Sequence, residues 1–221
     1  MPVVKYRILI LFNYFTFMYL SCYTYLENRF LSEVYIIMDK TISQFYDSDF
    51  IIKFESHATV LYEVNFDETK PEIDVKEIAN KLGFNIKYVF MEKSGKLEDG
   101  IIKVNLLDHE VRQRFTIAHE IGHFLLHDPN EVMYRDVSLQ SYKSIVERIK
   151  EREANGFAAE LLMPKRLLIK LINEYLEENN WDSLLDDIQF ETLLKDISKK
   201  LNVSKSSLEF RLQNLGVIKG E

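Results

Sequence analysis

The sequence has little cysteine and no excess of basic charge. Its 221 residues include one cysteine, Cys22, so the chain has neither an internal disulfide nor a cysteine-rich zinc site. The formal net charge is −7, whereas proteins that bind nucleic acid usually carry a basic stripe. DNA binding is therefore disfavoured, and the lone cysteine fits a cytoplasmic protein. Internal repeats and low-complexity segments are also lacking.

The N-terminal segment, residues 1–38, differs from the rest in its hydrophobicity. Residues 8–26 are 19 positions without a charge, long enough to span a bilayer. Lys5 and Arg7 would hold the N-terminus inside, and no signal-peptide cleavage site is evident. Three interpretations stay open for this segment: a membrane anchor, an artefactual extension before a start at Met38, or a buried element of the fold.

The most informative feature is the motif His119-Glu120-Ile121-Gly122-His123. Two histidines four positions apart on a helix lie on the same face, so both rings can bind one Zn²⁺. Glu120 follows the first histidine and can accept a proton from a water at that metal. A helix with a broad buried face is indicated by the apolar residues Phe115, Ile117, Ala118, Ile121, Leu125 and Leu126. This arrangement is typical of the zinc peptidases called zincins.

A zincin needs a third protein ligand, which leaves the fourth position for water. Residues 147–164 predict one helix, ended by the proline at its last position. Ala154 and Ala158 mark the inward face of that helix, and Glu151 shares this face. Glu153 is rotated by about 200° from Glu151. We therefore expect Glu151 to be the third ligand, with Glu153 as the alternative.

Other polar residues near the motif could support the site. Asn155 lies one turn after Glu151 and could hydrogen-bond a ligand histidine. His127 lies about 12 Å along the helix axis from His119, too far for the two to share one zinc. We expect His127 beside the ligands or at the helix C-terminus. Tyr134 or Tyr142 could stabilise a reacting carbonyl oxygen, although a packing or surface role is the simpler interpretation for each.

These two segments, in this order, resemble the ImmA/IrrE family of metallopeptidases. The similarity lies in residues 112–127 and 151–164. Residues 75–83 are similar to the family's opening helix, and residues 94–105 to its short hairpin. The resemblance implies an α+β, zincin-like domain with a small sheet and the HExxH helix. It also implies Zn²⁺ as cofactor, bound by His119, His123 and Glu151, with Glu120 as the catalytic residue.

The resemblance further implies a function and a partner. It predicts a zinc endopeptidase that cleaves a helix-turn-helix transcriptional repressor, which places the protein in the cytoplasm, with membrane anchoring through residues 8–26 as the alternative. A rival hypothesis is a regulator that contains zinc and binds a repressor without cleaving it. A purely structural zinc site is disfavoured because Glu120 is present and such a site would close the fourth position. A DNA-binding regulator ranks last.

The remaining pattern predicts further elements. His109 is interpreted as a residue at the start of the metal-binding helix, or less simply as a substrate-side donor. We expect a strand over Thr59–Val64 and a helix from Pro71 to about Leu82. Two extended runs, 85–92 and 101–105, should flank a turn region at 94–100. A polar connection should cover residues 128–144.

The C-terminal part predicts a pair of helices. The expected helices cover residues 190–201 and 208–215, with Ser204 as an N-cap between them and Gly216 at the end, which resembles a helix-turn-helix. Residues 182–221 hold six basic and seven acidic side chains, so attraction to phosphate is lacking. We expect packing or protein docking from this tail. The sequence thus predicts four segments: 1–38, hydrophobic; 39–67, unassigned; 68–165, the zinc peptidase domain; and 166–221, a small α-helical region.

Overall fold

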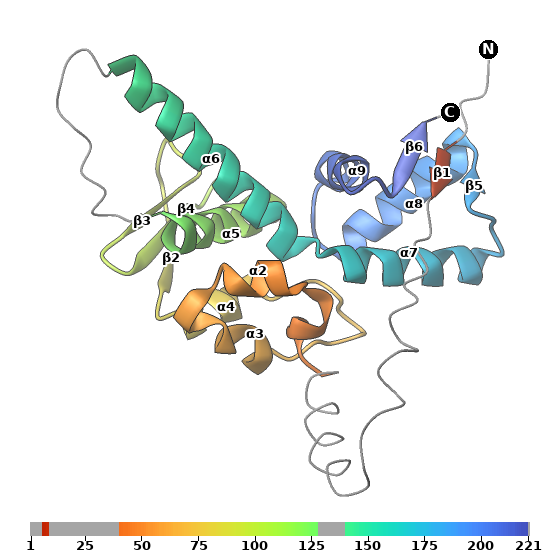
Figure 1. Ribbon diagram of the computed structural model, residues 1–221, viewed down its shortest axis with the longest axis horizontal. Helices are drawn as coiled ribbons and strands as arrows, with labels where there is room; N and C mark the ends of the chain where they lie inside the picture. The colour runs from red at the N-terminus through yellow and green to blue at the C-terminus, as the bar shows by residue number, and fades with distance from the viewer. Residues whose placement is uncertain (1–5, 9–39, 128–139, 221) are drawn as a thin grey trace, which may run out of the picture.

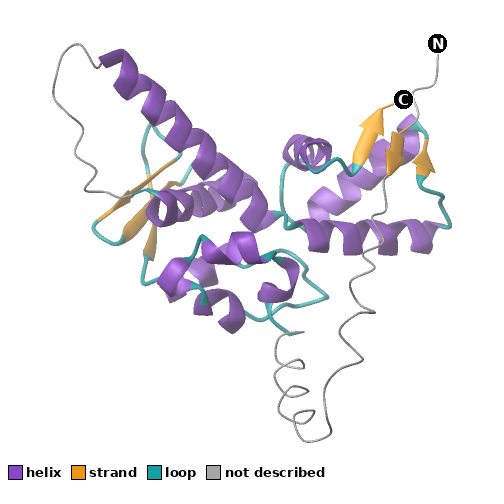
Figure 2. Ribbon diagram, in the orientation of Figure 1, coloured by secondary structure: helices purple, strands orange, loops and turns teal. Residues whose placement is uncertain are grey.

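The computed structural model describes residues 6–8, 40–127 and 140–220, and gives only the backbone for residues 6–8, 140–144, 219 and 220. Two lobes meet where helix α6 (Gln140–Leu162) passes into α7 (Lys165–Asn179) (Figure 1). The first lobe, residues 40–127 and 140–163, holds a three-stranded sheet, and the second lobe, residues 164–220 with 6–8, holds another (Figure 2). This mixed architecture confirms the predicted α+β class.

The sheet of the first lobe consists of β2 (Asn85–Val89), β3 (Gly95–Glu98) and β4 (Ile101–Asn105), in the order β2-β4-β3. The strands β2 and β4 are parallel, whereas β3 runs antiparallel to β4 and forms one edge. Asp99 and Gly100 connect β3 to β4 with φ values of 51° and 73°, as a two-residue hairpin turn requires. The hairpin is confirmed, and the expected turn region contains a strand.

Helix α5 (Glu110–Leu126) carries the HExxH motif and packs on α6. Its residues Ile117, Ala118 and Ile121 are fully buried, which confirms the predicted apolar face. Gly122 lies at the crossing point of the two helices. A Cβ atom there would come within 3.0 Å of the Phe157 ring and 3.3 Å of the Ala154 backbone. The glycine therefore lets α6 approach α5 closely enough to share a site with it.

The stretch that the sequence left unassigned forms short helices: η2 (Ile42–Phe45), α2 (Ser48–Ile52), η3 (Glu55–His57) and α3 (Thr59–Glu63). They pack against α6, where Phe50 stacks on Phe157 at 5.1 Å and the Tyr46 hydroxyl donates to the Leu161 carbonyl at 2.7 Å. The predicted strand at Thr59–Val64 is wrong. Its apolar side chains Val60 and Leu61 are buried from a helix, so tertiary packing overrides the β-branched composition.

Two predicted boundaries also need correction. Helix α4 (Val75–Lys81) begins four residues after Pro71, because the Asp74 side chain accepts hydrogen bonds from the amides of Lys76 and Glu77 and caps the helix there. The polar connection was expected to reach residue 144, yet α6 already begins at Gln140. Residues 128–139 of that connection lie outside the described residues.

The second lobe contains the predicted pair of helices, α8 (Asp187–Lys200) and α9 (Lys205–Asn214). The Ser204 side chain accepts a hydrogen bond from the Ser207 amide, which confirms the predicted N-cap, and Gly216 follows α9 with φ +64°. A small sheet with the order β5-β1-β6 joins β1 (Tyr6–Ile8) to β5 (Leu184–Leu185) and β6 (Ile218–Gly220).

Strand β1 shows that part of the N-terminal segment belongs to the fold, since it pairs antiparallel with strands on both sides. Residues 9–39 lie outside the described residues, and they include nearly all of the candidate membrane run. Within the described ranges, none of the helices combines the length and the apolar character needed to cross a bilayer.

Candidate active site

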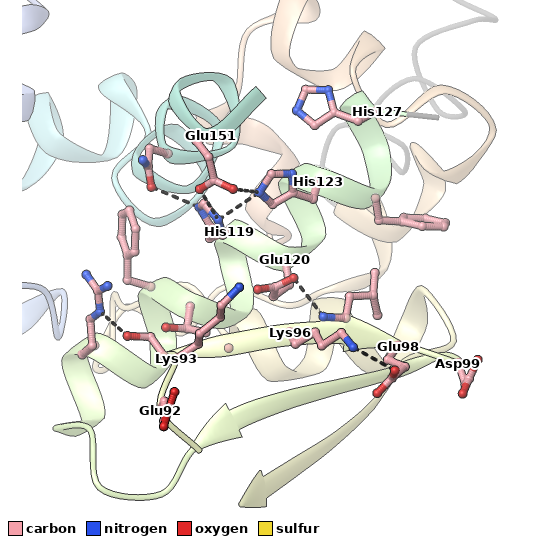
Figure 3. A pocket seen from close by; sticks show the side chains of 18 residues that line it. Glu92, Lys93, Lys96, Glu98, Asp99, His119, Glu120, His123, His127 and Glu151 are labelled. Atoms are coloured by element: carbon pink, nitrogen blue, oxygen red, sulfur yellow. Dashed lines mark hydrogen bonds and ion pairs between the residues drawn. The ribbon is translucent and has the colours of Figure 1, made fainter. Parts of the chain in front are cut away.

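A cleft of about 1100 Å³ lies between the two long helices of the first lobe and the segment that contains β3 (Figure 3). Helices α5 and α6 form one wall, from which His119, Glu120, His123 and Glu151 project. Residues 92–99 form the opposite wall.

His119, His123 and Glu151 converge at one point of the cleft. The two histidine Nε2 atoms lie 3.0 Å apart. The Glu151 carboxylate oxygens lie 3.4 Å from Nε2 of His119 and 3.3 Å from Nε2 of His123. Ligand atoms about 2.0–2.1 Å from a tetrahedral zinc lie about 3.3 Å from one another. The three side chains therefore fit one zinc-sized cation, and two nitrogens with one carboxylate are a donor set of catalytic zinc sites.

Asn155 and Glu151 come from the same face of α6, one turn apart, as the sequence pattern predicts. The Asn155 Oδ1 atom lies 3.0 Å from Nδ1 of His119. When Nδ1 carries the proton and donates to this oxygen, Nε2 keeps its lone pair and faces the other ligand atoms. Asn155 thus sets both the orientation of the His119 ring and the tautomer that metal binding needs.

Glu153 and His127 lie beside this group and outside it. One Glu153 oxygen is 3.9 Å from Nδ1 of His127, so this carboxylate faces away from His119 and His123. His127 is the C-cap of α5, and its Nε2 atom lies 3.1 Å from the Lys150 carbonyl. Its ring lines the cleft, and its contact with the Lys150 carbonyl links the C-terminal end of α5 to α6.

Burial controls the ionisation of the two histidines. It lowers the pKa of His119 and of His123, and the nearby Glu151 carboxylate only partly opposes this effect. Each ring is therefore neutral at neutral pH, the state in which a histidine can bind a metal. The electrostatics agree with the geometry of a metal site.

Glu120 is held by the opposite wall of the cleft. Its Oε2 atom accepts a hydrogen bond of 3.0 Å from the backbone amide of Leu97 in β3. Burial raises the pKa of the Glu120 carboxyl, while the Leu97 amide lowers it, the Glu151 charge raises it and the Lys93 charge lowers it. A carboxyl with a raised pKa, fixed beside a metal group, suits the transfer of a proton near neutral pH.

Gly95 makes this contact possible. A Cβ atom at Gly95 would lie 2.1 Å from Cγ2 of Thr116 and 3.2 Å from Oε1 of Glu120. Only glycine therefore lets β3 lie this close to α5. Neither Gly95 nor Leu97 could be recognised from the sequence, because the pattern at Gly95 is typical of a turn and a backbone amide leaves no sequence signal.

Another candidate from the sequence, His109, is not among the residues that line this cleft. Nδ1 of His109 accepts a hydrogen bond of 3.3 Å from the Val111 amide, so this residue caps the start of α5. Tyr134 lies outside the described residues, and the side chain of Tyr142 does as well.

A mixed fold with an HExxH helix and a converging His-His-Glu group defines a zincin-like metallopeptidase domain. Residues 80–213, more than half of the chain, match the peptidase family described as the IrrE N-terminal-like domain. The chain belongs to this family, which is the ImmA/IrrE family.

A curated relative is the radiation response metalloprotease IrrE of Deinococcus radiodurans. It is 27% identical over 115 residues, which cover 52% of this chain and 31% of that protein. The match thus spans about a third of the relative's length. The relationship supports a metal-dependent peptidase domain, while the relative's remaining length has no counterpart in the match.

Proposed function

We propose that this chain is a zinc-dependent endopeptidase. It would hydrolyse a peptide bond of a substrate protein in the cleft that lies between β3 and helices α5 and α6. The convergence of His119, His123 and Glu151 within 3.0–3.4 Å of one another, next to Glu120, carries the proposal. These three residues would hold the ion. The fit of two nitrogens and one carboxylate to a tetrahedral site favours zinc over magnesium or calcium, which prefer oxygen ligands.

The residues around the ion have separate roles. When bound, Zn²⁺ would polarise the scissile carbonyl and acidify a water molecule beside it. Glu120 accepts the proton of the attacking water and then delivers it to the leaving amine. The Leu97 amide fixes the Glu120 carboxylate, and Asn155 fixes the His119 ring. Both contacts reduce the reorganisation needed during the reaction.

The edge strand β3 is the binding surface that we propose for the substrate backbone. It pairs on one side with β4 and turns the other side towards the cleft, where the Leu97 amide already contacts Glu120. An extended peptide could add to this edge through main-chain hydrogen bonds. Such binding requires a flexible, accessible segment in the substrate protein, because a folded helix or sheet cannot enter as a single strand.

We further propose that the substrate is a helix-turn-helix transcriptional repressor and that cleavage takes place in the cytoplasm. The family resemblance supports this proposal. The near balance of charge in the C-terminal lobe agrees with a protein partner rather than DNA, because phosphate attraction needs an excess of basic side chains.

The test is co-expression with the repressor encoded nearest to this gene, followed by intact-mass analysis of the repressor. The native protein should cut it, whereas Glu120→Gln should reduce the rate by about 10²–10⁴-fold, the usual contribution of general acid–base catalysis. The variant should retain zinc, because Glu120 is not a ligand. Equal cleavage by both proteins would contradict the role of Glu120. An intact repressor that co-purifies with both would favour the non-proteolytic regulator.

A further inference from the structure

In the proposed hydrolysis the cation would polarise the scissile carbonyl, but none of the residues described so far donates a hydrogen bond to its oxygen. When water attacks the scissile carbonyl, negative charge develops on the carbonyl oxygen, and enzymes place a hydrogen-bond donor or a cation there. Tyr134 and the side chain of Tyr142 lie outside the described residues. Among the described residues that line the cleft, several carry donor groups.

Most polar side chains that line the cleft already form a hydrogen bond or an ion pair with another residue. Lys96 donates to Glu98 at 2.8 Å, and Arg112 donates through Nε to the Ser94 hydroxyl at 3.2 Å. The Oδ1 atom of Asn155 lies 3.0 Å from Nδ1 of His119. Reorienting any of these groups towards a substrate would break a contact that holds one wall of the cleft or the metal group.

Lys93 differs from these residues. It precedes β3 in the wall opposite α5 and α6, and its ammonium end is turned into the cleft towards Glu120 (Figure 3). Its side chain is exposed, and among the described residues it has no hydrogen bond or ion pair. An unpaired cation thus faces the place where the scissile bond would lie.

We propose that Lys93 donates a hydrogen bond to the carbonyl oxygen of the scissile peptide as that oxygen becomes negative. This inference rests on the proposed peptidase function. The water oxygen bonds to the carbonyl carbon, the π pair moves to the carbonyl oxygen, and Glu120 takes the water proton. The C–N bond then breaks, the carbonyl reforms, and the proton passes from Glu120 to the amine. Lys93 stays protonated throughout.

The length and chemistry of lysine suit this role. Its ammonium is a compact charge with three donors on a flexible stem, so it can follow the carbonyl oxygen from planar to tetrahedral geometry. Its position on the strand wall, close to β3, also places it beside any peptide that pairs with that edge. Lys93 is therefore a catalytic residue in the proposed reaction, because it contacts a reacting atom.

The test compares Lys93→Met with Lys87→Met, which removes the same charge from β2 of the same sheet, at a position that does not line the cleft. On the repressor found by co-expression, Lys93→Met should lower kcat by about 10²–10³-fold, as the loss of an oxyanion donor does. KM, zinc content and thermal unfolding should stay unchanged. Lys87→Met should retain nearly native kcat, and Lys93→Arg should keep more activity than Lys93→Met.

A second readout does not depend on turnover. An alanine-based phosphinic pseudopeptide mimics the tetrahedral carbon, and calorimetry can measure its binding to each zinc-loaded protein. Lys93→Met should weaken this binding by at least about 10-fold, because transition-state analogues report such contacts. Lys87→Met should leave this binding unchanged.

The outcomes separate the two proposals. If the native protein cleaves and Lys93→Met cleaves equally well, the role of Lys93 is overturned while the peptidase stands. A change in KM alone would also overturn it, because it would mark a substrate-binding contact. If the native protein does not cleave at all, the proposed function fails, and the pseudopeptide decides about Lys93: a selective loss supports the contact, and equal affinities overturn it.

Discussion

The two lobes use their polar side chains in different ways. In the second lobe, polar groups are paired with complementary partners close by. Asp186 accepts from the Gln189 amide, the Tyr175 hydroxyl donates to Asp196 at 2.7 Å, and Lys205 pairs with Glu191. In the cleft of the first lobe, two neutral histidine nitrogens and a carboxylate instead meet at one point.

The paired polar groups of the second lobe stabilise the fold, whereas the converging groups of the cleft are arranged to bind a ligand. A donor and an acceptor satisfy each other, and their pairing adds about 1 kcal/mol to stability. Three groups that all offer electron pairs gain little from one another, whereas a cation among them would bind to all three. We therefore assign the chemistry to the first lobe and a supporting role to the second.

The second lobe supports the first through direct contacts. Arg211 of α9 donates to the Met163 carbonyl at 3.2 Å, next to the end of α6, and Asn202 donates to Glu110 at the start of α5 at 3.2 Å. Helices α5 and α6, which carry His119, His123 and Glu151, are thus each held at one end by a hydrogen bond from the second lobe. This placement explains why the family match runs through both lobes, to residue 213.

The largest effect should come from breaking the converging group itself. Glu151→Gln replaces a charged ligand by a neutral one and should weaken zinc binding by more than about 100-fold, because even the outer partners of zinc ligands change affinity by 10- to 100-fold. The matched variant Glu153→Gln should keep native affinity, since this side chain faces His127. Competition with a fluorescent zinc chelator measures both. The reverse ranking would make Glu153 the ligand.

A smaller effect should follow from widening the cleft at Gly95. Gly95→Ala places a Cβ atom 2.1 Å from Cγ2 of Thr116, so β3 must move away from Glu120. Overpacking of this kind typically costs about 1–3 kcal/mol, and the free energy of unfolding from urea titration should fall by that amount. The cleavage rate should fall as well, because the hydrogen bond from the Leu97 amide to the Glu120 carboxylate would be lost.

Two further variants sharpen this test. Adding Thr116→Ser removes the methyl group that collides and should restore both stability and cleavage. Gly156→Ala, on α6 with no atom within 4 Å of its new Cβ, should instead stabilise the protein by about 1 kcal/mol through helix propensity. Unchanged stability in Gly95→Ala would show that β3 lies farther from α5 than described.

The metal group could be predicted from the sequence because it depends on local helix geometry. The spacing of His119 and His123 fixes their common face, and the face shared with Ala154 and Ala158 selects Glu151 over Glu153. The structure places all three side chains together. These inferences need only the period of a helix and the chemistry of zinc.

The opposite wall could not be predicted because it depends on contacts between distant parts of the chain. The Leu97 amide contacts Glu120 from 23 residues away, and the need for glycine at position 95 arises only from the nearby Thr116. The same limit explains the wrong strand at Thr59–Val64, where packing against the core decides the conformation. Lys93 had no motif around it, and its exposure beside Glu120 appears only once the strand is placed.

The smallest effect should come from the second lobe and should leave the chemistry intact. The Asp186 side chain accepts from the Gln189 amide while the Gln189 side chain contacts the Asp186 amide, so the two form a capping box at the start of α8. Asp186→Ala removes the first contact and should cost about 1 kcal/mol. For a chain of this size that lowers the thermal midpoint by about 2–4 °C.

Zinc affinity and cleavage by Asp186→Ala should match those of the native protein at temperatures well below unfolding. Calorimetry of the variant alongside zinc titration measures both quantities on one sample. A loss of zinc affinity in this variant, without unfolding, would mean that the state of α8 reaches the metal group through the contacts of Arg211 and Asn202. The second lobe would then regulate the site and not only support it.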